Sequence, residues 1–269
     1  MVNVFNNINL VRENLKRVPF GLITDVDGTI SQIAPTPQQA VVSPLCRKYL
    51  AELCNQIALV AVISGRQVTK TRDMLGIKGM IYVGNHGMER FNDRYVNLLP
   101  DTQDYPSIIK ATIEEIAPFL SMENIIIENK GAVASIHYRL CYDHHLAQEH
   151  ILTVLNYSPH AKNLWIRQEK MAIELLPPVD VNKGTAILSL IREYGLKGGI
   201  YMGDDITDID AFKAIHSAGY DFDFQGYAIA IISSETPETV TQEADFTLKG
   251  VDDVERFLKW FSNTVREQG

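Results

Sequence analysis

Short apolar runs that end abruptly in polar residues recur in the N-terminal and C-terminal parts of the chain. Each run is apolar at consecutive positions, which is typical of strands buried on both faces of a parallel sheet. The runs that predict strands are Phe20–Thr24, Ala58–Ile63, Gly79–Val83 and Gly199–Met202. The segments between them predict helices over Pro44–Asn55, Val68–Leu75, Asn182–Tyr194 and Ile209–His216. This alternation predicts a doubly wound α/β core with a mostly parallel sheet.

The pattern changes between about residues 101 and 181, where apolar and polar residues alternate within the predicted strands. Such alternation is typical of an antiparallel sheet with one exposed face. Expected strands are Asn124–Glu128, Ala132–Arg139, Leu164–Gln168 and Lys170–Leu175, with helices over Ser107–Leu120 and His144–Leu155. We therefore predict an α+β domain at residues 104–180, inserted into a core formed by residues 1–103 and 181–269.

Polar segments directly follow the four predicted core strands. They are Asp25–Thr29, Ser64–Arg66, Gly84–Gly87 and Gly203–Asp205. In an open α/β sheet the ligand crevice lies outside the carboxyl ends of the strands. We therefore expect these segments, distant in sequence, to meet at one edge of the sheet.

Composition and charge narrow the choice of function. The chain has 269 residues and a formal net charge of −8, which argues against a general nucleic-acid binder. An anionic substrate would need local Lys, Arg or metal to offset this charge. The three cysteines form no CxxC pair, and the sequence has no visible signal peptide or membrane span. We expect a cytoplasmic protein without membrane contact.

Asp25 and Asp27 carry the first chemical signal, because two carboxylates in one tight turn repel each other unless a cation neutralises them. A hard divalent cation such as Mg²⁺ suits oxygen ligands. Gly28 would let the turn bend, and Thr29 would supply a hydroxyl near a phosphate. An ordinary Asp/Gly-rich turn is the alternative interpretation.

The other strand ends carry complementary groups. Ser64 and the amides of a helix N-terminus can bind a phosphate oxygen, although Ser64 could simply cap that helix. Lys183 lies at a helix start, where it opposes the helix dipole and would be explained by a nearby anion; a surface lysine is the alternative. Asp204 favours metal binding, whereas Asp205 and Asp208 could instead be acids of the first helical turn.

As an ordered set, these motifs resemble those of the haloacid-dehalogenase-like (HAD) phosphatases: DxDGT, a Ser or Thr, a Lys and a GDD segment. The resemblance implies a Rossmann-like core and hydrolysis of a phosphate monoester through an aspartyl-phosphate. It implies Asp25 as nucleophile, Asp27 as general acid/base, and Mg²⁺ bound by both and by Asp204. The other implied roles are phosphate binding by Thr29, Ser64, Gly65 and Lys183, and support of the site by Asp205 and Asp208.

Further motifs resemble the trehalose-6-phosphate phosphatase family within this superfamily. They are Tyr82–Glu89, Glu128–Gly131, His137–Arg139, Glu174–Pro177 and Asn182–Gly184. The similarity runs from about Phe20 to the C-terminal helix. It implies a C2-type cap and conversion of trehalose 6-phosphate to trehalose, with a trehalose-6-phosphate synthase acting in the same pathway. The implied substrate contacts are Arg66, His86, Glu128, Lys130, Arg139 and Glu174.

Several of these assignments rest on the resemblance alone. The alternation by itself favours exposed strand-face charges at Glu128, Lys130 and Arg139. His86 could contact substrate, but we favour an interpretation in which it braces the loop. We interpret Trp165 and Trp260 as packing residues rather than as a sugar platform, although Trp165 lies in the predicted cap.

The sequence also departs from the family pattern. Leu176 stands where the family usually has Arg, Asn85 replaces Ser, Val181 replaces an aromatic residue and Ile206 replaces Arg. Two other functions therefore stay open. One is a phosphatase for another sugar phosphate, of the sucrose-phosphate or mannosylglycerate-phosphate type. The other is a non-catalytic sugar-phosphate-binding domain, against which the complete set of acids and Lys183 argues.

Overall fold

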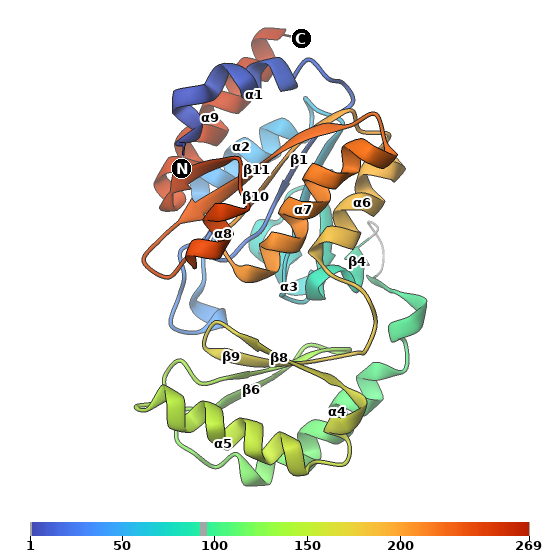
Figure 1. The fold of residues 1–269 in the computed structure, drawn as a ribbon, viewed down its shortest axis with the longest axis vertical. Helices are drawn as coiled ribbons and strands as arrows, with labels where there is room; N and C mark the ends of the chain where they lie inside the picture. Colours follow the sequence, from blue (N-terminus) through green and yellow to red (C-terminus); the bar gives the residue numbers. More distant parts are fainter. Residues whose placement is uncertain (1, 92–95, 269) are drawn as a thin grey trace. The chain divides into compact units, whose positions relative to one another are not determined.

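The computed structural model describes residues 2–91 and 96–268 (Figure 1). Its internal contacts divide the chain into two compact units. The core unit comprises Met1–Ala34, Gln39–Asn97 and Val181–Gly269; the insert unit comprises Pro35–Gln38 and Leu98–Asp180. The sequence-based boundaries were residues 103/104 and 180/181.

The core unit contains an eight-stranded sheet in the order β12-β11-β10-β1-β2-β3-β4-β5. The six strands from β12 to β3 are parallel, and β4 runs antiparallel to β3. The strands are β1 (Phe20–Thr24), β2 (Leu59–Ile63), β3 (Ile81–Gly84), β4 (Glu89–Phe91), β5 (Val96–Leu98), β10 (Gly198–Gly203), β11 (Gln225–Ile232) and β12 (Phe246–Lys249). The predicted fold class is confirmed.

Helices cover both faces of this sheet, as Figure 1 shows for α2 and α9 on one side and α6 and α7 on the other. Successive residues of a strand point to opposite faces, so Leu22 joins the apolar core under α2 and α9 while Ile23 joins the one under α6 and α7. The helices are α1 (Ile8–Asn14), α2 (Pro44–Leu53), α3 (Val68–Leu75), α6 (Lys183–Tyr194), α7 (Ile206–Asp221), α8 (Glu238–Gln242) and α9 (Gly250–Gln268). This double cover explains why the parallel strands are apolar at consecutive positions.

The insert unit is a four-stranded antiparallel sheet in the order β6-β7-β9-β8, with helices on one face. The elements are α4 (Tyr105–Ile116), β6 (Ile126–Asn129), β7 (Ala134–His137), α5 (His144–Tyr157), β8 (Trp165–Glu169) and β9 (Ala172–Leu176). Ile136, Ile173 and Leu175 pack against Ile109 of α4 and Ile151 of α5. The opposite face of the sheet carries polar side chains.

Short 3₁₀ helices complete the fold. They are η1 (Val4–Asn7), η2 (Pro37–Gln39), η3 (Asn85–Gly87), η4 (Pro100–Thr102), η5 (Ala117–Phe119) and η6 (Ala161–Asn163). Within residues 2–91 and 96–268, no helix combines the length and the apolar character needed to cross a membrane.

The two tryptophans differ in how far they are buried. Trp260 packs against the apolar core of the core unit, as expected. Trp165 is 49% exposed on β8, so its interpretation as a packing residue is wrong.

Candidate active site

Two buried carboxylates lie at the carboxyl ends of neighbouring strands. Asp25 follows β1, and Asp204 follows β10, which pairs with β1. Gly28 lets the turn after β1 pass close to Asp204: its φ is +78°, and a Cβ atom there would lie 2.1 Å from Asp204 Oδ2. One oxygen each from Asp25, Asp204 and Asp208 lies within 4.8 Å of the others. The strand ends thus bring together acids that are far apart in the sequence.

Lys183 lies among these acids with a buried side chain. Its Nζ donates a hydrogen bond to Asp208 Oδ1 over 2.6 Å and lies 3.3 Å from Asp25 Oδ1. It is the first residue of α6, which begins with a capping box formed by Asn182 and Thr185. A cation at this end opposes the helix dipole, so the neighbouring carboxylates stabilise its charge.

Asp208 is fully buried and accepts hydrogen bonds from four donors. Its Oδ1 accepts from Lys183 Nζ and from the Tyr201 hydroxyl. Its Oδ2 accepts from the backbone N–H groups of Asp204 and Asp205, each over 2.9 Å. Asp205 is the N-cap residue of α7. Because protein donors engage both oxygens, Asp208 is suited to hold the surrounding groups in place.

The charges in this cluster are unbalanced. Burial raises the pKa of Asp25 to about 8; Lys183 opposes this rise, whereas Asp208 and Asp27 add to it. Burial alone would lower the pKa of Lys183, but Asp208 and Asp25 outweigh it and raise that pKa. Three buried carboxylates therefore face one ammonium group. A divalent cation with a preference for oxygen ligands fits this set.

Ser64 and Gly65 follow β2 at the same edge of the sheet. Ser64 is buried, and its Oγ accepts a hydrogen bond from the Arg66 N–H over 3.2 Å. A Cβ atom on Gly65 would lie 2.7 Å from the ring of His86, and the backbone N–H of His86 donates to the Ser64 carbonyl. These contacts support the interpretation that His86 braces this turn. The Thr29 hydroxyl is also buried, and it has no hydrogen-bond partner among the described residues.

Asp27 pairs with Arg66 through two hydrogen bonds. Arg66 Nε donates to Asp27 Oδ2 over 2.6 Å, and a terminal nitrogen of Arg66 donates to Asp27 Oδ1 over 2.8 Å. The Asp27 side chain is 39% exposed and that of Arg66 is 12% exposed. Arg66 therefore orients the second acid of the turn, and its predicted substrate contact stays a prediction.

The remaining predicted residues belong to the insert unit. Lys130 Nζ and Ser135 Oγ both donate to Glu174 Oε1 over 2.9 Å, and all three residues are buried. Glu128 Oε2 lies 3.1 Å from His137 Nε2. Arg139 is partly exposed two residues after β7 ends. Charged and hydroxyl groups suited to hydrogen-bonding a sugar thus gather within this unit.

The sequence analysis missed several residues that position these groups. Tyr201 lies in an apolar strand, so nothing in the sequence indicates that its hydroxyl reaches Asp208. Glu89 accepts hydrogen bonds from the Val68 N–H and from the Asn85 side chain, which joins the loop after β3 to the start of α3. Asn85, noted above only as a departure, therefore has a structural role.

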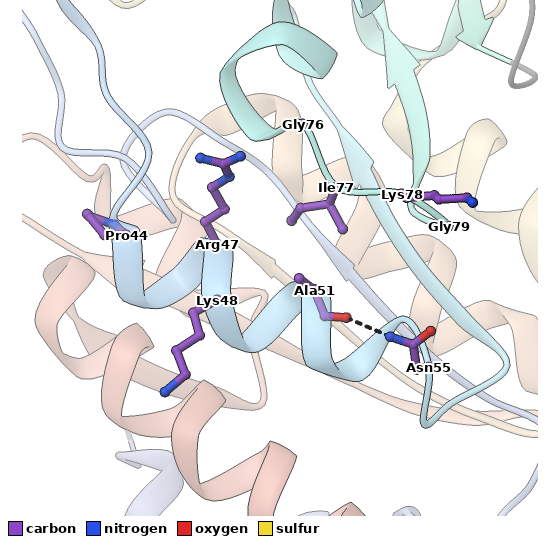
Figure 2. Close-up of a pocket in the computed structure, with 9 residues that line it drawn as sticks. All are labelled: Pro44, Arg47, Lys48, Ala51, Asn55, Gly76, Ile77, Lys78 and Gly79. Carbon is purple, nitrogen blue, oxygen red and sulfur yellow. Dashed lines mark hydrogen bonds between the residues drawn. The ribbon is translucent and has the colours of Figure 1, made fainter.

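A surface hollow of 730 Å³ lies elsewhere on the core unit (Figure 2). The segment before β3 and the exposed side of α2 line it, so it lies at the amino end of β3, opposite the edge that carries Asp25. Its lining residues are Pro44, Arg47, Lys48, Ala51, Asn55, Gly76, Ile77, Lys78 and Gly79. None of the predicted site residues contributes to it.

Sequence comparison shows which known proteins this chain is similar to. The family model of trehalose-phosphatase matches residues 23–252. A probable trehalose-phosphate phosphatase D of Arabidopsis thaliana is 28% identical over 263 residues, covering 91% of this chain and 69% of the relative. A probable trehalose-phosphate phosphatase of Sinorhizobium fredii is 30% identical over 205 residues, covering 74% of this chain and 75% of the relative.

Solved structures share the fold at lower identity. The C-terminal domain of a trehalose-6-phosphate phosphatase from C. albicans has a TM-score of 0.78 and 21% identity, covering 96% of this chain and 97% of that one. A trehalose-6-phosphate phosphatase related protein has a TM-score of 0.75 and 20% identity, covering 93% and 100% of the two chains.

Proposed function

Because the chain belongs to the trehalose-phosphatase family, we propose that it hydrolyses trehalose 6-phosphate to trehalose and inorganic phosphate. The observation that carries this proposal is the buried cluster in which Lys183 contacts Asp25 at 3.3 Å and Asp208 at 2.6 Å, with Asp204 close by. This cluster unites a carboxylate nucleophile, a fixed positive charge and metal-ligating oxygens.

Asp25 is the nucleophile in this proposal. Its carboxylate oxygen attacks phosphorus, the bond between phosphorus and the sugar oxygen breaks, and an aspartyl-phosphate forms. Lys183 stays protonated beside it and stabilises the negative charge that develops on the phosphoryl oxygens. The Ser64 and Thr29 hydroxyls, with the backbone of Gly65, would hold the same oxygens.

Mg²⁺ is the proposed cofactor, and the side chains of Asp25 and Asp204 with the backbone carbonyl of Asp27 would hold it. When bound, it would supply positive charge that keeps Asp25 ionised and offsets the charge of the phosphoryl group. Asp208 is not assigned as a ligand, because its two oxygens already accept four hydrogen bonds. Asp205 and Asp208 support the site through the start of α7.

Asp27 is the proposed general acid and base. In its protonated form it would give a proton to the departing sugar oxygen, and as a carboxylate it would then take a proton from water that attacks the aspartyl-phosphate. Arg66 holds both oxygens of Asp27 in the structure. The pair therefore fixes the direction in which Asp27 presents its carboxyl group.

The insert unit is the proposed cap that recognises the sugar, with contacts from Glu128, Lys130, Arg139 and Glu174. Acids accept hydrogen bonds from sugar hydroxyls, and Lys and Arg donate to them. We place this reaction in the cytoplasm, in trehalose biosynthesis, downstream of a trehalose-6-phosphate synthase.

A phosphate-release screen across sugar phosphates, with and without Mg²⁺, tests the proposal. We expect turnover that depends on Mg²⁺ and prefers trehalose 6-phosphate, and we expect Asp25→Asn to abolish turnover while the fold is retained. Asp210→Asn, an exposed acid on α7, serves as the control variant. A preference for sucrose phosphate or mannosylglycerate phosphate would replace the substrate assignment. Full activity of Asp25→Asn would refute the assignment of Asp25 as the nucleophile. Binding of a sugar phosphate by the wild-type protein without any turnover would favour a non-catalytic domain.

A further inference from the structure

One face of the insert sheet carries a polar row across all four strands. Glu128, Ser135, Glu174 and Arg167 lie opposite one another in register, from β6 through β7 and β9 to β8. The other face packs against α4 and α5. Arg167, at the β8 end of this row, was not among the residues singled out from the sequence.

The guanidinium group of Arg167 is weakly engaged. Its Nε lies 3.8 Å from Glu169 Oε1, beyond hydrogen-bond distance, and among the residues that the structure describes it donates no hydrogen bond. The side chain is 34% exposed. By contrast, Lys130 in the same unit is buried and bound to Glu174. Arg167 therefore offers donors that the fold itself does not use.

Trp165 shares this face with Arg167, because residues two apart in a strand point the same way. Gln168 confirms the orientation: it lies on the opposite face, where it accepts a hydrogen bond from Gln148 of α5. The cross-strand partner of Trp165 is Leu176, which is buried. Trp165 is 49% exposed, so an indole and a guanidinium group lie two residues apart in β8 on the same face of the sheet.

We infer that Arg167 and Trp165 form a sugar-specificity subsite, which rests on the proposed function and extends it. A guanidinium group presents five N–H donors in a fixed fork and can bond adjacent hydroxyls of a sugar ring. An indole offers a flat apolar surface to the C–H face of such a ring, and its N–H remains available to a hydroxyl. The pair recognises the part of a disaccharide phosphate that carries no phosphate. A small aryl phosphate lacks these hydroxyls and gains nothing from the pair.

Steady-state kinetics of the full chain with trehalose 6-phosphate and with p-nitrophenyl phosphate tests this inference. We expect Arg167→Ala and Trp165→Ala each to lower kcat/KM for the disaccharide phosphate about tenfold, mainly through KM, because each loses contacts made before the chemical step. Hydrolysis of p-nitrophenyl phosphate should be unchanged. Trp165→Phe should retain more activity than Trp165→Ala. Gln168→Ala, on the same strand but on the opposite face, should affect neither substrate.

Each contrary result has a distinct meaning. Unchanged disaccharide kinetics in both alanine variants would overturn the inference while leaving the proposed function intact. An equal loss on both substrates would overturn it as well, because the residues would then support folding. If the wild-type protein does not hydrolyse trehalose 6-phosphate but releases phosphate from another sugar, the proposed substrate fails and this inference fails with it.

Discussion

At the scale of single residues, the charge balance around Asp25 determines what the site can bind. Burial holds the pKa of Asp25 at about 8 even though Lys183 lies 3.3 Å away. A protonated Asp25 is neither a nucleophile nor a strong metal ligand. Under the proposed function, a bound cation would therefore complete the reactive state of this site.

The pH dependence of metal binding follows from this. Below about pH 8 a proton competes for Asp25, so we expect Mg²⁺ affinity to fall by up to about tenfold for each pH unit as the pH drops, and to level off above about pH 8. Isothermal titration calorimetry of the metal-free protein from about pH 6 to about pH 9 measures the Mg²⁺ affinity at each pH. Asp25→Asn should bind Mg²⁺ more weakly and without this pH dependence. The same slope in that variant would assign the proton to another group.

At the scale of elements, the start of α7 is the part that orders the site. Asp205 caps the helix. Asp208, in the first turn of the helix, accepts hydrogen bonds from the backbone N–H groups of Asp204 and Asp205. It also accepts hydrogen bonds from Lys183 of α6 and from Tyr201 of β10. One buried carboxylate thereby joins two helices and a strand. We therefore expect its removal to affect folding as well as the proposed chemistry.

Replacement of Asp208 by asparagine tests this role. The amide nitrogen of asparagine would face hydrogen-bond donors instead of accepting from them, and the charge of Lys183 would lose a neighbouring carboxylate. We therefore expect the free energy of unfolding to fall by about 3 kcal/mol. Urea denaturation monitored by circular dichroism measures the loss. Asp210→Asn, exposed on the same helix, should have little effect. A loss of similar size in both variants would mean that Asp208 has no special structural role.

At the scale of the whole molecule, the chain divides chemical groups between its two compact units. The core unit holds the acids, Lys183 and the turn proposed to bind phosphate, whereas the insert unit holds the residues proposed to bind sugar. Under this division, a change in the insert unit should alter which substrate is preferred without changing the chemical step.

The Arg139→Ala variant tests whether the insert unit sets substrate preference without changing the chemical step. We expect it to lower kcat/KM for trehalose 6-phosphate at least about tenfold, because a charged hydrogen bond to the substrate is lost, and to leave a small aryl phosphate nearly unaffected. Lys110→Ala removes an exposed charge on α4 of the same unit and is the control. Parallel losses on both substrates would indicate that Arg139 serves folding.

The core could be predicted well from the sequence because its signals are local. β1 and α3 begin and end at the predicted residues, and the meeting of Asp25 with Asp204 follows from parallel strands ending at one edge. β11 and β12 were missed; β11 contains an uninterrupted apolar run from Tyr227 to Ile232, whereas β12 is only four residues long and two of these, Thr247 and Lys249, are polar.

Side-chain pairing could not be predicted in the same way. The hydrogen bonds from Arg66 to Asp27 and from Tyr201 to Asp208 depend on the geometry of loops and strands. The spacing of these residues in the sequence does not predict that geometry. The exposure of Trp165 depends on which face of β8 packs against α5. In each case the residue type was visible in the sequence, but its partner lies on a different element of the fold.

The order of the core strands has a consequence for synthesis on the ribosome. β1 lies between β2 and β10, so its second neighbour is translated only after the whole insert unit. The insert sheet and its helices, by contrast, come from one continuous stretch of chain, Leu98–Asp180. A nascent chain that ends at β9 therefore contains every strand of the smaller sheet, while one edge of β1 still lacks its partner. Asp204 and Asp208, which complete the buried cluster with Asp25 and Lys183, follow only at the end of β10 and the start of α7. We therefore expect the proposed activity to be acquired late in synthesis.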